Sequence, residues 1–322
     1  MGMKCSLAAR LGLRYPILQA PIGSVASVDL AVAVSEAGGM GSLALTWTRP
    51  AAARKQVSEI RRRTSRNFFV NFVLSFEPVA LPAVLEAGAP VVTFSWGLPG
   101  KLVKQVHAAG AQVGVQVGTA AAARRAIEQG CDFVICQGVE AGGHVQSSTP
   151  LLELLEEVTE LAEVPVVAAG GLADRSDVAR VVAVGADAAM LGTRFVAANE
   201  SRAHASYKQA LVQAGAADTV MTGCFDGGWP YALHRVLRNT TLTRWEDDGC
   251  PPSGKRPGER DIVAKTTKAH PVHRYDDAPP TDEMSGDVLA CCLYAGRGVG
   301  RIHDIRPAAE LVATLGQEIS GP

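Results

Sequence analysis

Residues 112–137, QVGVQVGTAAAARRAIEQGCDFVICQ, contain the unit that decides the fold. An apolar run rich in valine, Gln112–Val117, is followed by an alanine-rich segment with helical periodicity, Ala120–Gln129. Gly130 then predicts the end of the helix, because glycine tolerates the left-handed conformation that closes a helix. A second apolar run, Phe133–Gln137, follows after two residues. The runs are apolar throughout, as expected for strands that are buried on both faces in a parallel sheet.

The same strand–helix rhythm recurs through the first two-thirds of the chain. The eight candidate strands are Tyr15–Ile22, Met40–Trp47, Phe68–Leu74, Val91–Trp96, Gln112–Val117, Phe133–Gln137, Val164–Ala169 and Ala188–Phe195. The helix candidates between them are Ser27–Ala37, Ala51–Arg63, Val79–Ala87, Leu102–Ala109, Ala120–Gln129, Leu151–Leu161 and Arg175–Val184. Eight such units favour a closed barrel over an open doubly wound sheet, so we predict an α/β protein with a (β/α)8 TIM barrel.

The rhythm stops after about residue 199, and the rest of the chain has a different character. Residues 201–216 have helical periodicity, whereas Thr222–Gly286 is polar, rich in Gly and Pro, and weakly periodic. We interpret that stretch as an excursion over one end of the barrel, with some helix around Pro230–Arg238. The segment Pro307–Leu315 is typical of a closing helix. The predicted organisation is a barrel core with the cofactor site (1–200), a lid or small domain (201–286) and a C-terminal segment that returns to the barrel (287–322).

Composition and charge exclude several classes of partner. The chain has 31 Lys and Arg against 32 Asp and Glu, which gives no reason to expect nucleic acid or an anionic membrane as a partner. No apolar run reaches the length of a membrane span, and Met1–Arg14 lacks the apolar core of a signal peptide, so we expect a cytoplasmic protein. The seven cysteines form no CxxC pair, and adjacent Cys291 and Cys292 suit neither a disulfide nor a zinc site. We expect reduced, mostly buried thiols and no metal, and a homodimer is compatible with these features.

Two glycine-rich strand ends predict a phosphate site. Active sites of this fold lie where the strands end, and a ligand phosphate often binds between the loops after the seventh and eighth strands. Gly170-Gly171 follows the seventh candidate strand, and Gly192-Thr193 lies within the eighth. Such residues leave backbone N–H groups unobstructed, and Thr193 adds a hydroxyl donor. The alternative is that these glycines only make tight turns.

The segment Gly142-Gly143-His144 after the sixth strand is the most distinctive local feature. Two glycines let a flat ligand approach the backbone closely, and an imidazole can take or give a proton near neutral pH. A purely structural histidine is the alternative. The position favours catalysis by His144, because the other histidines lie on predicted helices, in the excursion or near the tail. Glu140 either orients this loop or faces solvent.

Three neutral amides, Asn71, Gln116 and Gln137, lie in or at the ends of strands. Their donors and acceptors can match the edge of an isoalloxazine ring, and hydrogen bonding inside the barrel is the alternative. Paired carboxylates, a cluster of metal ligands, a Walker loop and a GxGxxG motif are all absent from the sequence.

Taken together, these segments resemble nitronate monooxygenases, formerly called 2-nitropropane dioxygenases. The matching pieces are Tyr15–Pro21, Val70–Phe72, Gln116–Thr119, Cys136–His144, Ala169–Gly171, Leu191–Phe195, His234–Asn239 and Tyr294–Gly300, so the resemblance covers nearly the whole chain. The superfamily also includes FMN-dependent enoyl-ACP reductases.

The resemblance implies a non-covalent FMN and a set of residues to hold it. The flavin contacts would come from Ala20, Pro21, Ile22, Asn71, Gln116, Gln137, Gly142 and Gly143. Gly170, Gly171, Gly192 and Thr193 would bind the phosphate, His144 would be the catalytic base, and Tyr294 would contact substrate. The chain departs from the family at Ile22, Met190 and Arg297, where relatives often carry Met, Gln and Gln. The change to Arg297 lies near the expected substrate entrance.

Three functions follow as hypotheses. The first is oxidation of nitronates or nitroalkanes by O2 to a carbonyl compound and nitrite, with a small nitro compound and O2 as partners. The second is an NAD(P)H-dependent FMN reductase of enoyl thioesters or quinones. The third is a phosphate-binding barrel without flavin, such as a lyase, an isomerase or a binding protein, because phosphate sites of this type serve many chemistries.

Overall fold

The computed structural model describes residues 7–227, 229 and 231–317. Eight parallel strands form one sheet in the order β1-β9-β8-β6-β5-β4-β3-β2. A parallel bridge between Leu18 and Met40, with the Gln19 N–H donating to the Met40 carbonyl, joins the two outer strands of that order and closes the barrel. The predicted (β/α)8 barrel is therefore confirmed. Its strands are β1 (Ile17–Gln19), β2 (Gly41–Ala44), β3 (Phe68–Val73), β4 (Val91–Ser95), β5 (Gln112–Val117), β6 (Phe133–Gln137), β8 (Val166–Ala169) and β9 (Ala188–Leu191).

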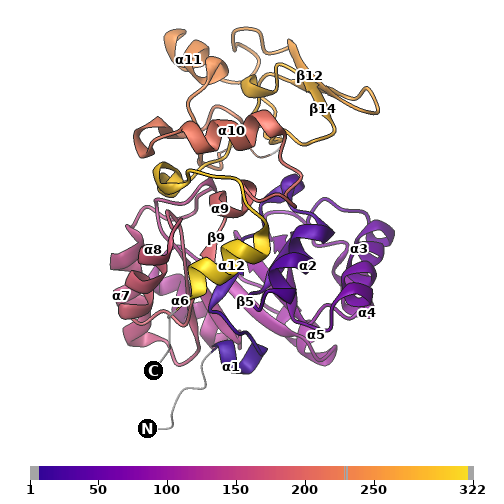
Figure 1. The fold of residues 1–322 in the computed structure, drawn as a ribbon, viewed down its shortest axis with the longest axis vertical. Coiled ribbons are helices and arrows are strands. Elements are labelled where there is room, and N and C mark those ends of the chain that lie inside the picture. The colour runs from indigo at the N-terminus through magenta and orange to yellow at the C-terminus, as the bar shows by residue number, and fades with distance from the viewer. Residues whose placement is uncertain (1–6, 228, 230, 318–322) are drawn as a thin grey trace.

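Helices surround the barrel, as Figure 1 shows. They are α2 (Val28–Glu36), α3 (Pro50–Arg63), α4 (Leu81–Glu86), α5 (Leu102–Ala108), α6 (Ala120–Glu128), α7 (Leu151–Leu161) and α8 (Arg175–Ala183). Each predicted helix between strands is present with similar bounds. The expected helix-closing glycines have positive φ angles, such as 89° at Gly130 and 109° at Gly185. A side chain there would be strained, so these glycines set where the helices end.

The eighth strand is shorter than predicted. The sequence predicted a strand over Ala188–Phe195, whereas β9 ends at Leu191 and a short helix, α9, spans Thr193–Val196. The break occurs at Gly192, whose φ of −102° and ψ of −72° leave the extended conformation. Phe195 and Val196 continue the apolar run in the sequence and are both buried, but they belong to a helix and not to a strand.

The barrel interior is packed with side chains at its amino end. Leu18, Phe69, Val91, Phe133 and Val167 are all buried there in one cluster. The helix α1 (Leu7–Leu11) adds Leu7 and Leu11 to the same cluster from below. A larger apolar layer lies between the strands and the helices. Because the interior is filled, a ligand can enter only at the carboxyl ends of the strands.

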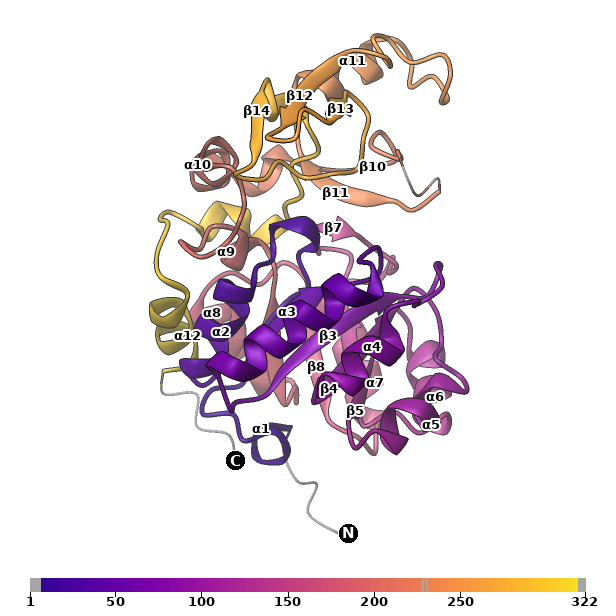
Figure 2. The ribbon, with the colours of Figure 1, turned by 90° about the vertical axis from the view of Figure 1, so that its right-hand side faces the viewer.

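The segment after residue 199 lies above those strand ends (Figures 1 and 2). It contains α10 (Ala205–Gln213), η2 (Ala216–Asp218), β10 (Thr219–Thr222), β11 (His234–Leu237), α11 (Thr240–Asp247), β12 (Ile262–Thr266), β13 (Pro271–His273) and β14 (Met284–Gly286). The helix predicted around Pro230–Arg238 is wrong, because residues 234–237 form a strand, and Pro230 lies outside the described residues. Strand β11 pairs with two neighbours, β10 and β7 (Gly143–His144), and such tertiary pairing overrides local preference.

The chain then returns to the barrel. It passes through η3 (Val288–Ala290) and η4 (Arg297–Arg301) and ends in α12 (Ala308–Gly316), which packs against α2 and α8 and confirms the predicted closing helix. Buried Arg194 forms an ion pair with Asp304 at 2.9 Å and fastens this return segment to α9. In the described part of the chain, no helix is both long and apolar enough to cross a membrane. Six cysteines are unpaired, five of them buried, as predicted, and Cys5 lies outside the described residues.

Candidate active site

A cavity of about 580 Å³ opens at the carboxyl ends of the barrel strands, below the segment that covers them. That volume is in the usual range for a cofactor or substrate pocket. All fourteen candidate site residues line it: Ala20, Pro21, Ile22, Asn71, Gln116, Gln137, Gly142, Gly143, His144, Gly170, Gly171, Gly192, Thr193 and Tyr294. The barrel thus brings together residues from Ala20 to Thr193, which are up to 173 positions apart in the sequence, because parallel strands end at one rim. Tyr294 reaches the cavity from the segment that returns to the barrel.

The amides at this rim are partly engaged with the protein. The Asn71 amide nitrogen donates to the Ser95 hydroxyl at 3.3 Å, and its oxygen accepts from Thr93 at 2.9 Å. The Gln137 amide nitrogen donates to the carbonyl of His144 at 3.1 Å. An amide nitrogen has two hydrogens, so each residue keeps a donor for a ligand while its orientation is fixed.

Gln146 is a residue that the sequence reasoning missed. Its side-chain oxygen accepts from the Trp96 N–H at 2.9 Å, and its side-chain nitrogen donates to the Gln116 carbonyl at 2.9 Å. Its own N–H donates to the Gln137 side-chain oxygen at 3.0 Å. Gln146 therefore ties the ends of β4, β5 and β6 together. The sequence signal for it is weak, since it lies two residues beyond the glycine–histidine segment.

His144 lies in the short strand β7, which pairs with β11 of the covering segment. Gly143 and His144 are opposite Arg235 and His234, and the Val145 N–H donates to the Leu233 carbonyl at 2.9 Å. The strand that carries the predicted base follows barrel strand β6 in the sequence but belongs to the sheet β10-β11-β7 of the segment above (Figure 2). This pairing, together with the hydrogen bond from the Gln137 side chain to the His144 carbonyl, fixes the backbone of His144.

The imidazole of His144 is largely buried. Burial, together with the neighbouring His234, lowers the pKa of His144 to about 3, so the ring is neutral near neutral pH. Within the described part of the chain, its buried Nε2 atom has no hydrogen-bond partner. A buried polar atom without a partner is costly, and such atoms gather where a ligand or a reaction uses them.

His234 lies beside His144, with ring centres 5.4 Å apart. Its Nε2 accepts from the Phe225 N–H at 3.2 Å, and its Nδ1 is 3.1 Å from the Ala232 carbonyl. These partners require a proton on Nδ1, which makes His234 a neutral residue that is fixed in place. The family resemblance includes the segment that begins at His234, but no role was predicted for this residue, because a helix and not a strand was expected there.

The glycines of the β6 loop are required for different reasons. A Cβ at Gly142 would lie 2.3 Å from the backbone nitrogen of Gly296, so close packing against the return segment demands glycine there. Gly143 has a φ of 74° but open space around the position of a Cβ. Its glycine is needed for the backbone conformation, and the open space belongs to the cavity.

The predicted phosphate loops approach each other at the rim. Gly170 and Gly171 have φ angles of 116° and 69°, so these positions favour glycine whatever they bind. At Gly192 a Cβ would only touch Ala20 and Ile22, both at 3.6 Å. The Thr193 hydroxyl accepts from the Gly296 N–H at 3.0 Å, which leaves its own hydrogen available to a ligand.

Aromatic side chains form the opposite part of the cavity lining. Trp47, Trp96 and Trp229 line it together with Tyr294, whose ring centre is 5.5 Å from that of His144. The Tyr294 hydroxyl donates to the Asp277 carbonyl at 2.8 Å, so that hydrogen is already used. Trp47 and Trp96 are the last residues of two predicted strands. They could have been predicted as site residues, because active-site residues of this fold lie where the strands end. Trp229 had no such signal.

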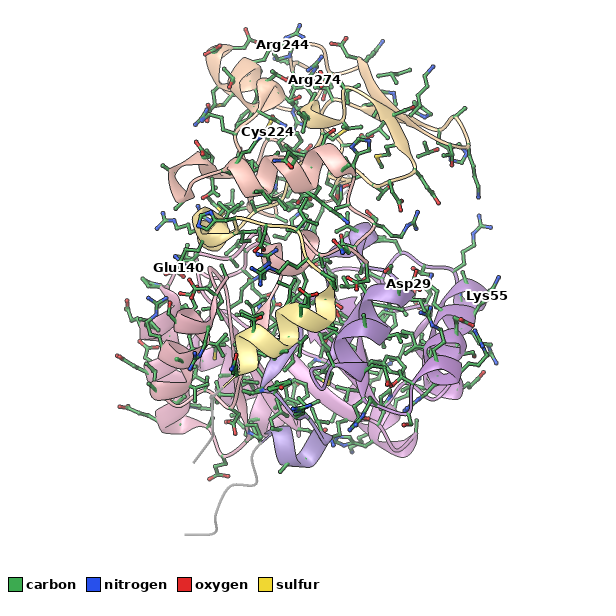
Figure 3. All side chains as sticks on the ribbon, in the orientation of Figure 1. Asp29, Lys55, Glu140, Cys224, Arg244 and Arg274 are labelled. Atoms are coloured by element: carbon green, nitrogen blue, oxygen red, sulfur yellow. The ribbon has the colours of Figure 1, made fainter. Side chains whose placement is uncertain are left out.

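Glu140 and Arg297 lie outside the central cavity. The Glu140 carboxylate accepts from the Leu151 N–H at 3.0 Å, and its carbonyl accepts from the Arg297 N–H at 3.0 Å, so this residue orients the loop. Figure 3 labels Glu140 beside the barrel, below Cys224 of the covering segment. Arg297 lines a smaller depression with Glu140, Arg180 and Arg301, rather than the substrate entrance expected for it.

Comparison with known proteins agrees with this geometry. The family model described as nitronate monooxygenase matches residues 4–83 and 79–318. The chain belongs to the nitronate monooxygenase family. The nitronate monooxygenase of Pseudomonas aeruginosa is 31% identical, over 97% of this chain and 98% of the relative. FabK from Thermotoga maritima has a TM-score of 0.80 and 30% identity, over 97% of this chain and 94% of that one. The nitroalkane oxidase from Streptomyces ansochromogenes has a TM-score of 0.76 and 29% identity, over 95% and 96%.

Membership of this family makes the protein an FMN-dependent oxidoreductase. The cavity fits that cofactor in three respects. It has the volume, its glycine-rich rim offers backbone donors and the Thr193 hydroxyl for a phosphate, and Asn71 and Gln137 keep amide donors near the strand ends. Met190 lines the cavity without a donor, so it cannot hydrogen-bond a flavin as an amide would.

Proposed function

We propose that this enzyme oxidises nitroalkanes and nitronates with O2 to a carbonyl compound and nitrite. One observation carries the proposal beyond family membership. A neutral histidine, His144, lines the cavity with a buried Nε2 that has no partner among the described residues. A base for a carbon acid needs this combination, since it must be unprotonated and unoccupied before the substrate arrives.

His144 would take the proton from the carbon next to the nitro group. The product pair is an imidazolium ion beside a nitronate anion, and each charge compensates the other in a site with little water. The lowered pKa of His144 in the unliganded site therefore reflects the cost of a buried imidazolium without a counter-ion. It does not measure the basicity of His144 when a nitronate anion forms beside it. Gln137 supports this step because it holds the backbone carbonyl of His144.

The cofactor would be held non-covalently by this chain's own groups. The backbone at Ala20, Pro21 and Ile22, with Asn71, Gln116, Gln137, Gly142 and Gly143, would contact the ring system. Gly170, Gly171, Gly192 and Thr193 would bind the phosphate. When bound, FMN supplies the electron acceptor and the site of reaction with O2. Tyr294 would limit the space above His144, where substrate lies.

We also propose that residues 201–286 act as a lid over a barrel core of residues 1–200, with 287–322 returning to the barrel. The pairing of β11 with β7 supports this division, since it is the joint at which the lid reaches His144. The unpaired thiols support a reducing compartment such as the cytoplasm.

A second candidate is an NAD(P)H-dependent reductase of enoyl thioesters or quinones. The likeness to FabK supports it, because the fold and the glycine-rich rim would serve either reaction. The difference lies in which compound delivers electrons to the cofactor.

Anaerobic rapid mixing of the holoenzyme tests the two candidates. The enzyme is mixed separately with 2-nitropropane, its nitronate, NADH and NADPH, and the visible flavin absorbance is followed. We expect rapid loss of that absorbance with a nitro compound and none with either nicotinamide. Rapid loss with a nicotinamide, while both nitro compounds are inert, would replace the proposal by the reductase.

A further inference from the structure

The cavity extends past His144 to a loop of the segment above the barrel. Asp277, Ala278 and Pro279 of that loop line it. Tyr294 lies between His144 and the loop, because its ring centre is 5.5 Å from that of His144 while its hydroxyl donates to the Asp277 carbonyl at 2.8 Å. Among the described residues that line the cavity, Asp277 is the only one with an acidic side chain.

The backbone of residues 276–280 is held in place by contacts with other parts of the chain. In addition to the hydrogen bond from the tyrosine hydroxyl, the Pro280 carbonyl accepts from the His204 N–H at 3.0 Å. On another side the loop packs closely, since a Cβ at Gly227 would lie 2.9 Å from the Cα atom of Asp276. The loop therefore keeps one position in the cavity lining.

Three carboxyl groups lie near one another at this loop, and two of them have partners. The Asp226 carboxylate forms a two-point ion pair with buried Arg256, at 2.6 Å for each oxygen. The Asp276 carboxylate accepts from the His273 N–H at 2.7 Å. The Asp277 carboxyl has no ion pair or hydrogen bond with any other residue in the part of the chain that the structure describes, and only its own backbone N–H contacts it.

The Asp277 carboxyl lacks a hydrogen-bond donor that a ligand could supply. Burial raises the pKa of Asp277, and the negative charges of Asp276 and Asp226 add to the effect. A buried carboxylate without a donor is costly, and a donor on a bound ligand would remove that cost. The pKa of His144 is shifted by burial and by His234, and not by Asp277. The carboxyl therefore does not oppose an anion that forms beside His144.

We propose that Asp277 is a specificity-determining residue, which binds an amino or hydroxyl group at the end of the substrate distant from the nitro-bearing carbon. The proposal rests on the function proposed above and names its substrate class, which is nitroalkanes and nitronates with a hydrogen-bond donor on a linear chain. The nitro-bearing carbon would lie at His144, and the chain would pass Tyr294. An amino group would bind as an ammonium ion, whose charge-assisted hydrogen bond is stronger than that of a hydroxyl.

Calorimetric titration of the holoenzyme with unreactive amides tests the ligand class without turnover, since a planar amide replaces the nitro group. The probes are 4-aminobutanamide, 5-aminopentanamide and 6-aminohexanamide, which differ in reach. Each is compared with the alkyl amide of the same size, which is pentanamide, hexanamide or heptanamide. At the length that reaches Asp277, we expect the amino amide to bind at least about fivefold more tightly than its alkyl counterpart. A smaller advantage at every length would overturn the proposal.

Asp277→Asn tests the residue itself, because it removes the charge and keeps the size of the side chain. The preference for the amino amide should fall to about twofold or less, while the FMN content of the purified protein is unchanged. Asp287→Asn is the matched control, since Asp287 is an exposed acid that does not line the cavity, and it should leave the preference intact. A preference that survives Asp277→Asn, or that falls equally in the control, would overturn the role of Asp277.

Oxygen consumption with nitroalkanes that carry or lack the terminal amino group tests the reaction separately. We expect the higher kcat/KM for the amino compound. If the amino amides bind as expected but no nitro compound is oxidised, the ligand class stands and the reaction is wrong. If nitroalkanes are oxidised but the amino amides have no advantage, the reaction stands and the inferred role of Asp277 is wrong.

Discussion

The two walls of the cavity differ in chemistry and in how they are held. The barrel wall presents backbone N–H groups, amides and glycines at the ends of strands, whose positions follow from seven parallel strand pairings and the bridge that closes the barrel. The segment above the barrel adds Trp229 and buried His234, and it reaches the loop that carries His144 through a short antiparallel joint between β11 and β7. The first wall suits a cofactor that every family member shares, and the second suits a substrate that can differ among members.

Because the two walls differ, substitutions in one wall should affect different properties of the enzyme from substitutions in the other. A defect in the barrel wall should lower FMN retention or stability. A defect in the lid should change substrate binding while the flavin remains. His144 belongs to both walls, so its loss should have the largest effect on activity.

The largest effect is expected for His144→Ala. Its kcat/KM for a neutral nitroalkane should fall by about 10³-fold, because general-base catalysis typically contributes that much. Activity on the preformed nitronate should fall far less, since no proton remains to be removed. Steady-state oxygen consumption with both forms of one nitro compound measures the two values, and equal small losses would contradict the role of His144.

The next largest effect is expected for Gly142→Ala. The added Cβ would meet backbone atoms of Gly296 and Ala295 at 2.3 Å and 2.5 Å, and backbone cannot rotate away as a side chain can. We expect a loss of about 3 kcal/mol in the free energy of unfolding, with weakened FMN retention.

Gly215→Ala is the control for that prediction. Its φ is −95°, and the nearest contact of a Cβ would be the Asp218 carboxylate at 3.6 Å, so stability should change little. Denaturant unfolding and the flavin content of purified protein measure both variants. Equal stability of the two would mean that the return segment can shift to admit the methyl group.

A smaller and more selective effect is expected for Arg256→Met in the lid. The substitution removes the ion pair that fixes Asp226 and, through it, Trp229. We expect KM for the nitro substrate to rise by roughly tenfold, with FMN content nearly unchanged. Arg244→Met, which removes an exposed ion pair with Asp261, should leave KM within about twofold. Loss of FMN from Arg256→Met would show that the two walls are not separable.

The smallest effect is expected from moderate acid. An exposed histidine would become protonated near its ordinary pKa of about 6.5, and activity that needs it neutral would fall below that pH. The pKa of His144 is lowered to about 3, so protonation of His144 should cause no loss of kcat/KM between about pH 8 and about pH 6. A pH profile on a neutral nitroalkane measures this, and an acid limb near 6.5 would contradict the lowered pKa of His144.

The same lowered pKa has a consequence for the stability of the flavin-free protein. The unfolded chain binds a proton at His144 below about pH 6.5, whereas the folded chain resists it until about pH 3. Stability from this group is therefore fully present above the unfolded pKa and is lost as the pH falls through that window. Burial lowers the pKa of His234 too, which adds in the same direction.

The barrel could be predicted from the sequence because its determinants are local and repeated. Runs such as Gln112–Val117 and Phe133–Gln137 match β5 and β6 in full, and Gly130 closes the helix between them. The prediction was wrong where it extended the last strand to Phe195. The backbone turns at Gly192, and the apolar residues that follow form a helix instead of a strand.

The sequence predicted a segment over one end of the barrel but not the structure within it, since the strands of that segment are defined by partners that are distant in the sequence. His234–Leu237 is a strand because β7 and β10 lie on either side of it, and the polar, loop-rich sequence around it carries no period. His234, Trp229 and Gln146 were not predicted for the same reason, since their roles depend on contacts with other segments of the chain.

The sequence by itself determined the barrel, the family and which residues meet at the rim, because parallel strands bring their carboxyl ends together whatever lies above them. Only the tertiary structure decided that His144 is largely buried and neutral, that Gly142 is demanded by Gly296, and that Trp229 packs against the His144 ring. Those properties come from burial and contact between distant segments, and burial and contact depend on three-dimensional packing rather than on the order of residues.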